Sequence, residues 1–151
     1  MAQGDLIVFD SALVNIGNDW DMNSDTFNYG IVTNATVPTR DTAAPHWGGT
    51  GTTDFSANET GTGGTSYTGP VALSGLSWSE AAANTFRLDF SDPATLAQDA
   101  SGFTTGYWAI IYNATDANKR CLCAIDLGGP VSLTAGSLDF NFNANGIFQI
   151  T

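Results

Sequence analysis

The stretch that decides the fold reads Tyr107-Trp-Ala-Ile-Ile-Tyr112, Asn113-Ala-Thr-Asp-Ala-Asn118 and Arg120-Cys-Leu-Cys-Ala-Ile-Asp-Leu127. The first part is a short continuous apolar run, typical of a strand that is covered on both faces. The Asn- and Asp-rich part after it favours a turn. We therefore predict an antiparallel hairpin at the centre of a sheet, with its second strand ended by Gly128-Gly-Pro130.

Alternation of apolar and polar residues predicts further strands on both sides of this hairpin. Segment 25–33 is predicted to be half-buried. Segment 137–143 shows the clearest alternation, with Leu138, Phe140 and Phe142 facing inward and Asp139, Asn141 and Asn143 facing water. The remaining predicted strands are 71–78, 85–90 and 147–150.

A helix is predicted only near the N-terminus. Apolar residues at positions 6, 9, 13 and 16 share one helical face, and Gly17-Asn18 is a good stop signal. Strands at regular spacing with one terminal helix predict a mainly β chain: an antiparallel β-sandwich or flattened barrel with one short N-terminal helix. We expect residues 1–151 to form a single β-rich domain.

Composition and charge narrow the classes of partner. The 151 residues include 15 acids and 4 bases, for a net charge of −11, and only 13% of residues are charged. Such a field repels phosphate, which disfavours nucleic acid and anionic membranes as partners. No apolar run approaches the roughly 18 residues of a spanning helix. The start of the chain lacks the basic residues of a signal peptide, so we expect a product of the cytoplasm.

The segment 34–69 is too long for an ordinary connection and has no periodicity of its own. It is rich in Gly and Thr and contains Trp47, Phe55 and Tyr67. We expect these rings to fix the segment to the body, and the segment itself to serve contacts between subunits.

Catalytic residue patterns are weak. His46 is the single histidine and has no nucleophile elbow beside it, so a loop histidine packed in a turn is favoured over a Ser-His-Asp relay. Glu59 and Glu80 are the only glutamates, and neither occupies a recognisable glycosidase context. We predict that the protein is not an enzyme and needs no cofactor.

Metal-binding patterns are incomplete too. Asp19, Asp21, Asn23 and Asp25 have the spacing of calcium ligands, but Ser24 and Gly30 stand where a glycine and a glutamate are needed. A helix-to-strand turn is favoured, and weak cation binding by these four residues stays open.

The cysteine pair and the glycine-rich loop are also incomplete as binding motifs. The pair Cys121 and Cys123 lacks the second pair of a zinc site and is interpreted as two small buried hydrophobic residues without a disulfide. The glycine-rich segment 61–65 lacks the lysine that a phosphate-binding loop needs.

The order of several short motifs resembles a widespread family of small virion proteins of tailed bacteriophages, encoded among head genes. The similarity covers nearly the full length. The motifs are Phe9-Asp-Ser-Ala-Leu-Val14, Asn23-Ser-Asp-Thr-Phe-Asn28, Ile31-Val-Thr33, Gly61-Thr-Gly63 to Tyr67-Thr-Gly69, Ala97-Gln-Asp-Ala-Ser-Gly-Phe103, Trp108-Ala-Ile-Ile-Tyr-Asn113, Lys119-Arg120, Ile125-Asp-Leu-Gly128 and Asn143-Ala-Asn-Gly-Ile-Phe148.

The resemblance implies a capsid decoration or cement protein. Such a subunit is β-rich and commonly trimeric, lies on the outer surface of the head, and bridges neighbouring major capsid proteins. No catalytic or binding residue is carried over from the family. Two alternatives stay open: a glycan-binding β-sandwich module of a phage fibre or surface protein, with Trp20, Trp47 or Trp78 stacked on sugar rings, and a structural component of the tail or neck.

Overall fold

A computed structural model describes residues 2–150, which form a mainly β structure with antiparallel sheets and one α-helix, as the sequence predicts. In chain order the elements are β1 (Leu6–Val8), α1 (Asp10–Asn18), β2 (Phe27–Val32), β3 (Pro45–His46), β4 (Thr53–Asp54), a short 3₁₀ helix η1 (Ser56–Asn58), β5 (Val71–Ala72), β6 (Ser77–Ala82), β7 (Thr85–Asp89), β8 (Gly106–Asn113), β9 (Cys121–Val131) and β10 (Phe148–Ile150).

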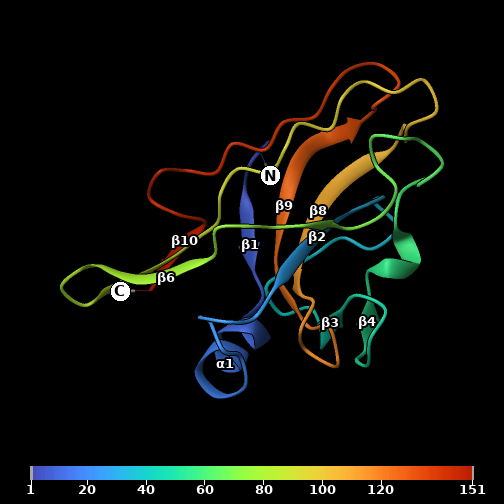
Figure 1. Cartoon of the computed structure of the whole chain (residues 1–151). Coiled ribbons are helices and arrows are strands. Elements are labelled where there is room, and N and C mark those ends of the chain that lie inside the picture. Colours follow the sequence, from blue (N-terminus) through green and yellow to red (C-terminus); the bar gives the residue numbers. More distant parts are fainter. Residues whose placement is uncertain (1, 151) are drawn as a thin grey trace.

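The centre of the molecule is a five-stranded sheet in the order β1-β9-β8-β2-β5, antiparallel throughout (Figure 1). The predicted hairpin supplies its two middle partners, β8 and β9. Ile110 and Ile111 in β8 and Leu122 in β9 are fully buried, as expected of strands covered on both faces. The hairpin prediction is therefore confirmed.

The prediction that Gly128-Gly-Pro130 ends the second strand is wrong, because β9 continues to Val131. Gly128 (φ +82°) and Gly129 (φ +119°) adopt backbone conformations that other residues rarely take. They bend the strand instead of ending it, and Val131 still pairs with Gly106 across an irregular register. The curved end of β9 is visible in Figure 1.

Irregular chain covers both faces of this sheet. On one face, Trp47 from segment 34–69 stacks on Tyr112, with ring centroids 5.3 Å apart. On the other face, Phe140 packs on Tyr29 at 5.0 Å and Phe90 on Phe27 at 5.5 Å. Strand β2 is thus buried on both sides, apart from Asn28, and is not half-buried as predicted. Since the covering layers of residues 2–150 are mostly loops, a sandwich or flattened barrel is not confirmed.

Segment 137–143 buries two of the three side chains predicted to face inward and leaves Phe142 partly exposed, and it is not a strand. Leu138 and Phe140 are buried and Asp139 is exposed, as the alternation predicts. The backbone, however, makes only an isolated bridge between Leu138 and Leu96. The segment lies over the face of the sheet, where Phe140 packs on Tyr29. Alternation reports which side is buried, not whether a partner strand exists.

Two predicted boundaries are also corrected. Residues 6–8 pair with β9 as a strand, so the helix starts at Asp10 and positions 6 and 9 of the predicted helical face lie outside it. Leu13 and Val14 of the helix are exposed. The β-branched Ile7 and Val8 favour the extended conformation there. The predicted strand 71–78 splits into β5 and the start of β6, with Gly75 (φ +67°) between them.

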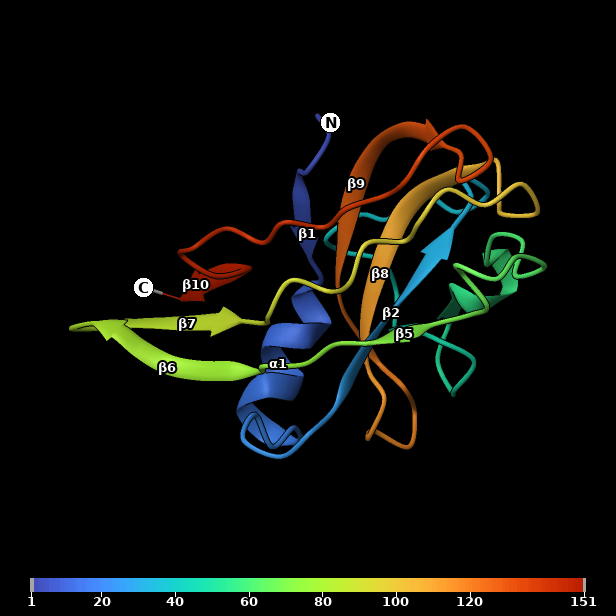
Figure 2. The ribbon, with the colours of Figure 1, turned by 45° about the horizontal axis from the view of Figure 1, so that its top comes forward.

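A second, three-stranded sheet in the order β10-β7-β6 projects from the body (Figure 2). Its hairpin between β6 and β7 turns at Asn84, which has a φ of +62°. The C-terminal β10 pairs with β7, from Phe148 opposite Leu88 to Ile150 opposite Phe86. We call these three strands the arm.

Candidate functional site

The arm has one apolar and one polar face. Residues directly opposite each other in antiparallel strands share a face. The pairings place Trp78, Leu88 and Phe148 in one row and Glu80, Phe86 and Ile150 in the next row of the same face. We call these six residues the arm face. The other side carries the polar residues Ser77, Ser79, Arg87, Asp89 and Gln149.

The arm face is buried at its root and exposed at its tip. Leu88 is fully buried, whereas Phe86 is 44% and Ile150 is 39% exposed. Trp78 stacks on Phe86 with ring centroids 5.8 Å apart. Isolated exposed apolar residues are ordinary, but neighbouring ones on a projecting sheet are typical of an interaction surface.

The apolar surface continues from the arm onto the body. A groove of about 330 Å³ runs between β10 and β1, each of which is an edge strand of its own sheet. Its walls include Leu6, Val8, Phe148 and Ile150, and it reaches Leu13 of α1, which is 40% exposed. We call this hollow the arm groove. The groove and the tip of the arm face share Ile150 and therefore form one continuous surface.

Among residues 2–150, the charged side chains around this surface do not pair with Glu80. Arg40 at the groove is held by Asp10 at 2.9 Å. Arg87 lies on the opposite face of the arm and donates to the carbonyl oxygen of Ala144 at 3.2 Å. Within residues 2–150, no lysine or arginine forms an ion pair with Glu80. The exposed tip thus combines stacked aromatic rings, an aliphatic side chain and an unneutralised carboxylate.

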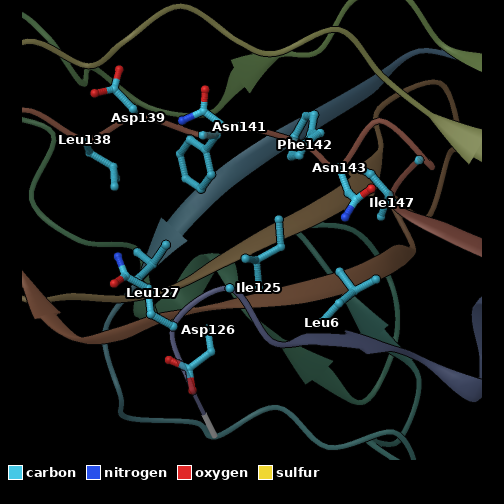
Figure 3. A pocket seen from close by; sticks show the side chains of 14 residues that line it. Leu6, Ile125, Asp126, Leu127, Leu138, Asp139, Asn141, Phe142, Asn143 and Ile147 are labelled. Atoms are coloured by element: carbon cyan, nitrogen blue, oxygen red, sulfur yellow. The ribbon is translucent and has the colours of Figure 1, made fainter.

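A larger hollow of about 460 Å³ lies between β9 and the segment 138–147. Figure 3 shows Leu138 and Phe142 on one side of the hollow and Leu6, Ile125 and Leu127 on the other, while the carboxylate of Asp139 points away. The hollow exists because segment 138–147 rests on the sheet without pairing to it. Its walls combine apolar side chains such as Leu6, Ile125 and Phe142 with the polar side chains of Asn141 and Asn143.

His46 is buried in β3, with Nδ1 3.8 Å from Asp54 Oδ1. The hydroxyl of the neighbouring Ser56 donates to the same carboxylate oxygen at 2.7 Å. In a catalytic relay the histidine lies between the serine and the aspartate. Here the Ser56 hydroxyl donates its hydrogen bond directly to Asp54, so His46 does not lie between them. The three residues form a packed turn beneath Gly51, where an added Cβ would come within 2.4 Å of the imidazole.

The acidic loop after α1 is held by hydrogen bonds within the chain. Asp21 accepts from the backbone N–H of Asn23 at 3.0 Å and from the Ser24 hydroxyl at 2.8 Å. Asp25 accepts from the Asn113 amide at 2.6 Å, and Asp19 pairs with Arg120 at 2.6 Å. The loop connects α1 to β2, which confirms the interpretation of these residues as a helix-to-strand turn. Among the residues described, no group of three or more His, Cys, Asp or Glu is placed to hold a metal.

The tryptophans lie mostly in the core. Trp20, Trp47 and Trp108 are each buried, and only Trp78, on the arm, is partly exposed. Trp20 and Trp47 are therefore not available to stack on a sugar ring. Of the two glutamates, Glu59 accepts a hydrogen bond from the Tyr67 hydroxyl at 2.7 Å, and Glu80 belongs to the arm face.

Both cysteines are free and fully buried in β9. Burial raises the pKa of each thiol above its usual value, and a nearby Cys123 adds to this effect on Cys121. Since the thiolate is the reactive form, we expect neither thiol to react with a disulfide reagent at pH 8 in the native protein. Both should react promptly once urea unfolds the chain. Prompt reaction of either thiol before unfolding would contradict the packing seen here.

Segment 34–69 is fixed to the body as predicted, with Trp47, Phe55 and Tyr67 all buried. Tyr67 packs edge-on against Phe103 at 5.6 Å, and its hydroxyl accepts the backbone N–H of Ile31 at 2.9 Å. The segment adds the two-stranded parallel pair β3 and β4. Whether it contacts other subunits stays a prediction.

Asp99 ties the end of this segment to residue 101. Backbone N–H groups of Ser66, Ser101 and Thr65 donate to its carboxylate and lower its pKa to about 2. Since the folded-state pKa is depressed, the stabilisation is present above the unfolded value near pH 4 and is lost as the pH falls toward 2. We expect the carboxyl carbon of Asp99 to titrate near pH 2 by NMR, and the Asp99→Asn variant to lose part of this acid dependence. A midpoint near the ordinary 3.8 would contradict these bonds.

Comparison with models of known protein families, with curated proteins and with solved structures found no match for this chain. Within residues 2–150, no helix is long and apolar enough to cross a bilayer. The alternation in the predicted strand 85–90 places Phe86, Leu88 and Phe90 on one face, but it does not indicate that Phe86 is exposed at the tip of an arm.

Proposed function

We propose that the chain is a structural protein of a tailed-bacteriophage virion: a capsid decoration or cement subunit. It binds the outer surface of the head and stabilises the lattice of the major capsid protein. The observation that carries this proposal is the projecting arm, whose tip exposes Phe86 and Ile150 beside the arm groove. A surface of this kind is suited to adhesion to another protein.

Charge supports a position outside the shell. A net charge of −11 repels the phosphates of a packaged genome, and a site on the exterior keeps the two apart. The proposal includes synthesis in the cytoplasm of the bacterial host and, following the motif resemblance, a trimer on the capsid. It includes no nucleic-acid partner, no membrane partner and no catalytic role.

The proposal is tested on purified heads prepared with and without this protein. Both preparations are heated in steps, or shocked by rapid dilution from high salt, and DNA release is followed with an intercalating dye. We expect heads that carry the protein to release DNA at a higher temperature. Equal release temperatures at full occupancy would contradict the cement role.

The glycan-binding alternative makes a different prediction. With Trp20 and Trp47 buried, only Trp78 remains for sugar stacking, and Trp47→Ala would report on folding. Binding to a glycan array that is abolished by Trp78→Ala, together with no binding to heads, would replace the present proposal with a lectin-like module.

A further inference from the structure

We propose that the arm face and the arm groove receive a surface segment of the major capsid protein in which a lysine or arginine is flanked by apolar side chains. This inference rests on the proposed function and names the partner chemistry of its binding surface. It is carried by three observations: the exposed apolar tip, its continuity with the groove, and the unpaired Glu80 in the same row as Phe86 and Ile150.

The apolar part of the segment fits the groove. The hollow of about 330 Å³ is lined mostly by aliphatic and aromatic side chains, together with Arg40 and Gln149, and opens beside two edge strands, β1 and β10. A volume of this order accommodates one or two aliphatic side chains of a partner. Contacts with Leu13, Ile150 and Phe86 would remove from water three of the large apolar side chains that the structure leaves exposed.

The basic part of the segment fits the tip. Glu80 lies directly opposite Phe86 in the register of β6 and β7, and Phe86 is stacked on Trp78. A carboxylate beside stacked aromatic faces offers a cation both an ion pair and a cation–π contact. The nearest basic residues of the chain do not compete for this place, since Arg40 is paired with Asp10 and Arg87 is on the opposite face.

Charge favours a capsid segment over a second copy of this chain. A second copy of the chain also has a net charge of −11, so the two copies repel each other. A symmetric contact between two arm faces would also bring two Glu80 carboxylates together. A basic partner gains from the same field that would oppose self-association, and its encounter rate rises at low salt. The arm face is therefore assigned to the capsid, and any contacts within a trimer are assigned to other surfaces.

The test measures binding of the purified chain to heads that lack it, by co-sedimentation over a range of concentrations. We expect the double variant Phe86→Ser/Ile150→Ser to bind about tenfold more weakly or worse, because exposed apolar anchors at an interface centre carry much of the affinity. Glu80→Lys should weaken binding by a similar factor, with the loss largest at low salt. The matched control Ser79→Ala changes the polar face of the same strand and should bind as the unaltered chain does.

Folding is checked separately, since Phe86 and Ile150 are among the most exposed apolar residues and their replacement should leave the unfolding temperature nearly unchanged. Binding of all variants as tight as the unaltered chain would overturn the inference while leaving the proposed function standing. Failure of the unaltered chain to bind heads would contradict the proposed function itself. A loss of self-association in the double variant, with head binding retained, would assign the arm face to a second copy and overturn the inference.

Discussion

Replacing Arg120 with methionine is expected to lower the free energy of unfolding at pH 7 by about 3 kcal/mol, because a buried carboxylate then loses its cation. The Arg120 guanidinium is bound to Asp116, whose side chain is only 6% exposed. It also donates to Asp19 at 2.6 Å and to Asn15 at 2.7 Å, and lies 6.0 Å from the Trp20 ring centroid. One side chain thus joins α1, the loop after it and the hairpin. Urea denaturation of the two proteins measures the change.

The pH dependence of this effect has a defined sign. Burial by itself raises the pKa of Asp116, but hydrogen bonds from Arg120 and Trp20 outweigh it and lower that pKa below its usual value. Stabilisation by the ionised carboxylate is therefore present above the unfolded pKa of about 3.9 and lost as the pH falls through the folded value. The difference between the unaltered chain and Arg120→Met should shrink as the pH is lowered from 5 toward 3.

The matched control is Arg40→Met. Arg40 also pairs with an aspartate, Asp10, but both side chains are more than half exposed. Exposed ion pairs contribute about 0–1 kcal/mol, so this variant should be close to the unaltered chain in stability. Equal losses for Arg40→Met and Arg120→Met would mean that the burial of Asp116 is not what makes the second pair important.

Replacing Trp47 with alanine is expected to cost about 3–5 kcal/mol of unfolding free energy, because a large buried ring leaves a cavity. The ring lies on one face of the sheet across β8 and β2: it is parallel to Tyr112 with an angle of 2° between the planes, and it fills the space above Gly30. An added Cβ at Gly30 would come within 2.1 Å of the indole. Gly30→Ala should therefore also destabilise, by about 1–3 kcal/mol, through overpacking.

These changes are measured by chemical denaturation followed through tyrosine and tryptophan fluorescence. Trp78→Ala is the matched control, since Trp78 has a similar aromatic stacking partner in Phe86 but is partly exposed on the arm. The unfolding free energy that Trp78→Ala loses should be well under half of that lost by Trp47→Ala. A larger loss for Trp78 than for Trp47 would contradict the assignment of segment 34–69 to the core and of the arm to the surface.

The central sheet was predictable because its signals are local. The run at 107–112 is apolar at every position, and the turn before Arg120 is rich in Asn and Asp, so a buried hairpin needs no knowledge of the rest of the chain. The burial of Trp47, Phe55 and Tyr67 followed from ring size alone. The two cysteines at the start of β9 are buried and free, as their place beside the apolar run of the hairpin predicts.

Features that depend on distant partners were not predictable. Segment 137–143 has the alternation of a strand, yet the partner it finds is the face of the sheet at Tyr29. Gly128 and Gly129 bend β9 and do not end it. The strand continues beyond them because Val131 still pairs with Gly106. The arm likewise required β10, from the C-terminal end, to pair with β7, and this pairing leaves Phe86 exposed. Sequence patterns do not specify which neighbour covers an apolar face.

A density map of the whole phage particle tests most directly whether the chain is a capsid subunit. At a resolution that shows side chains, we expect copies of the five-stranded sheet on the outer surface of the head, with the β6–β7 hairpin and Phe86 in contact with the major capsid protein. Density for the chain only in the tail or neck, or its complete absence from mature particles, would contradict this assignment.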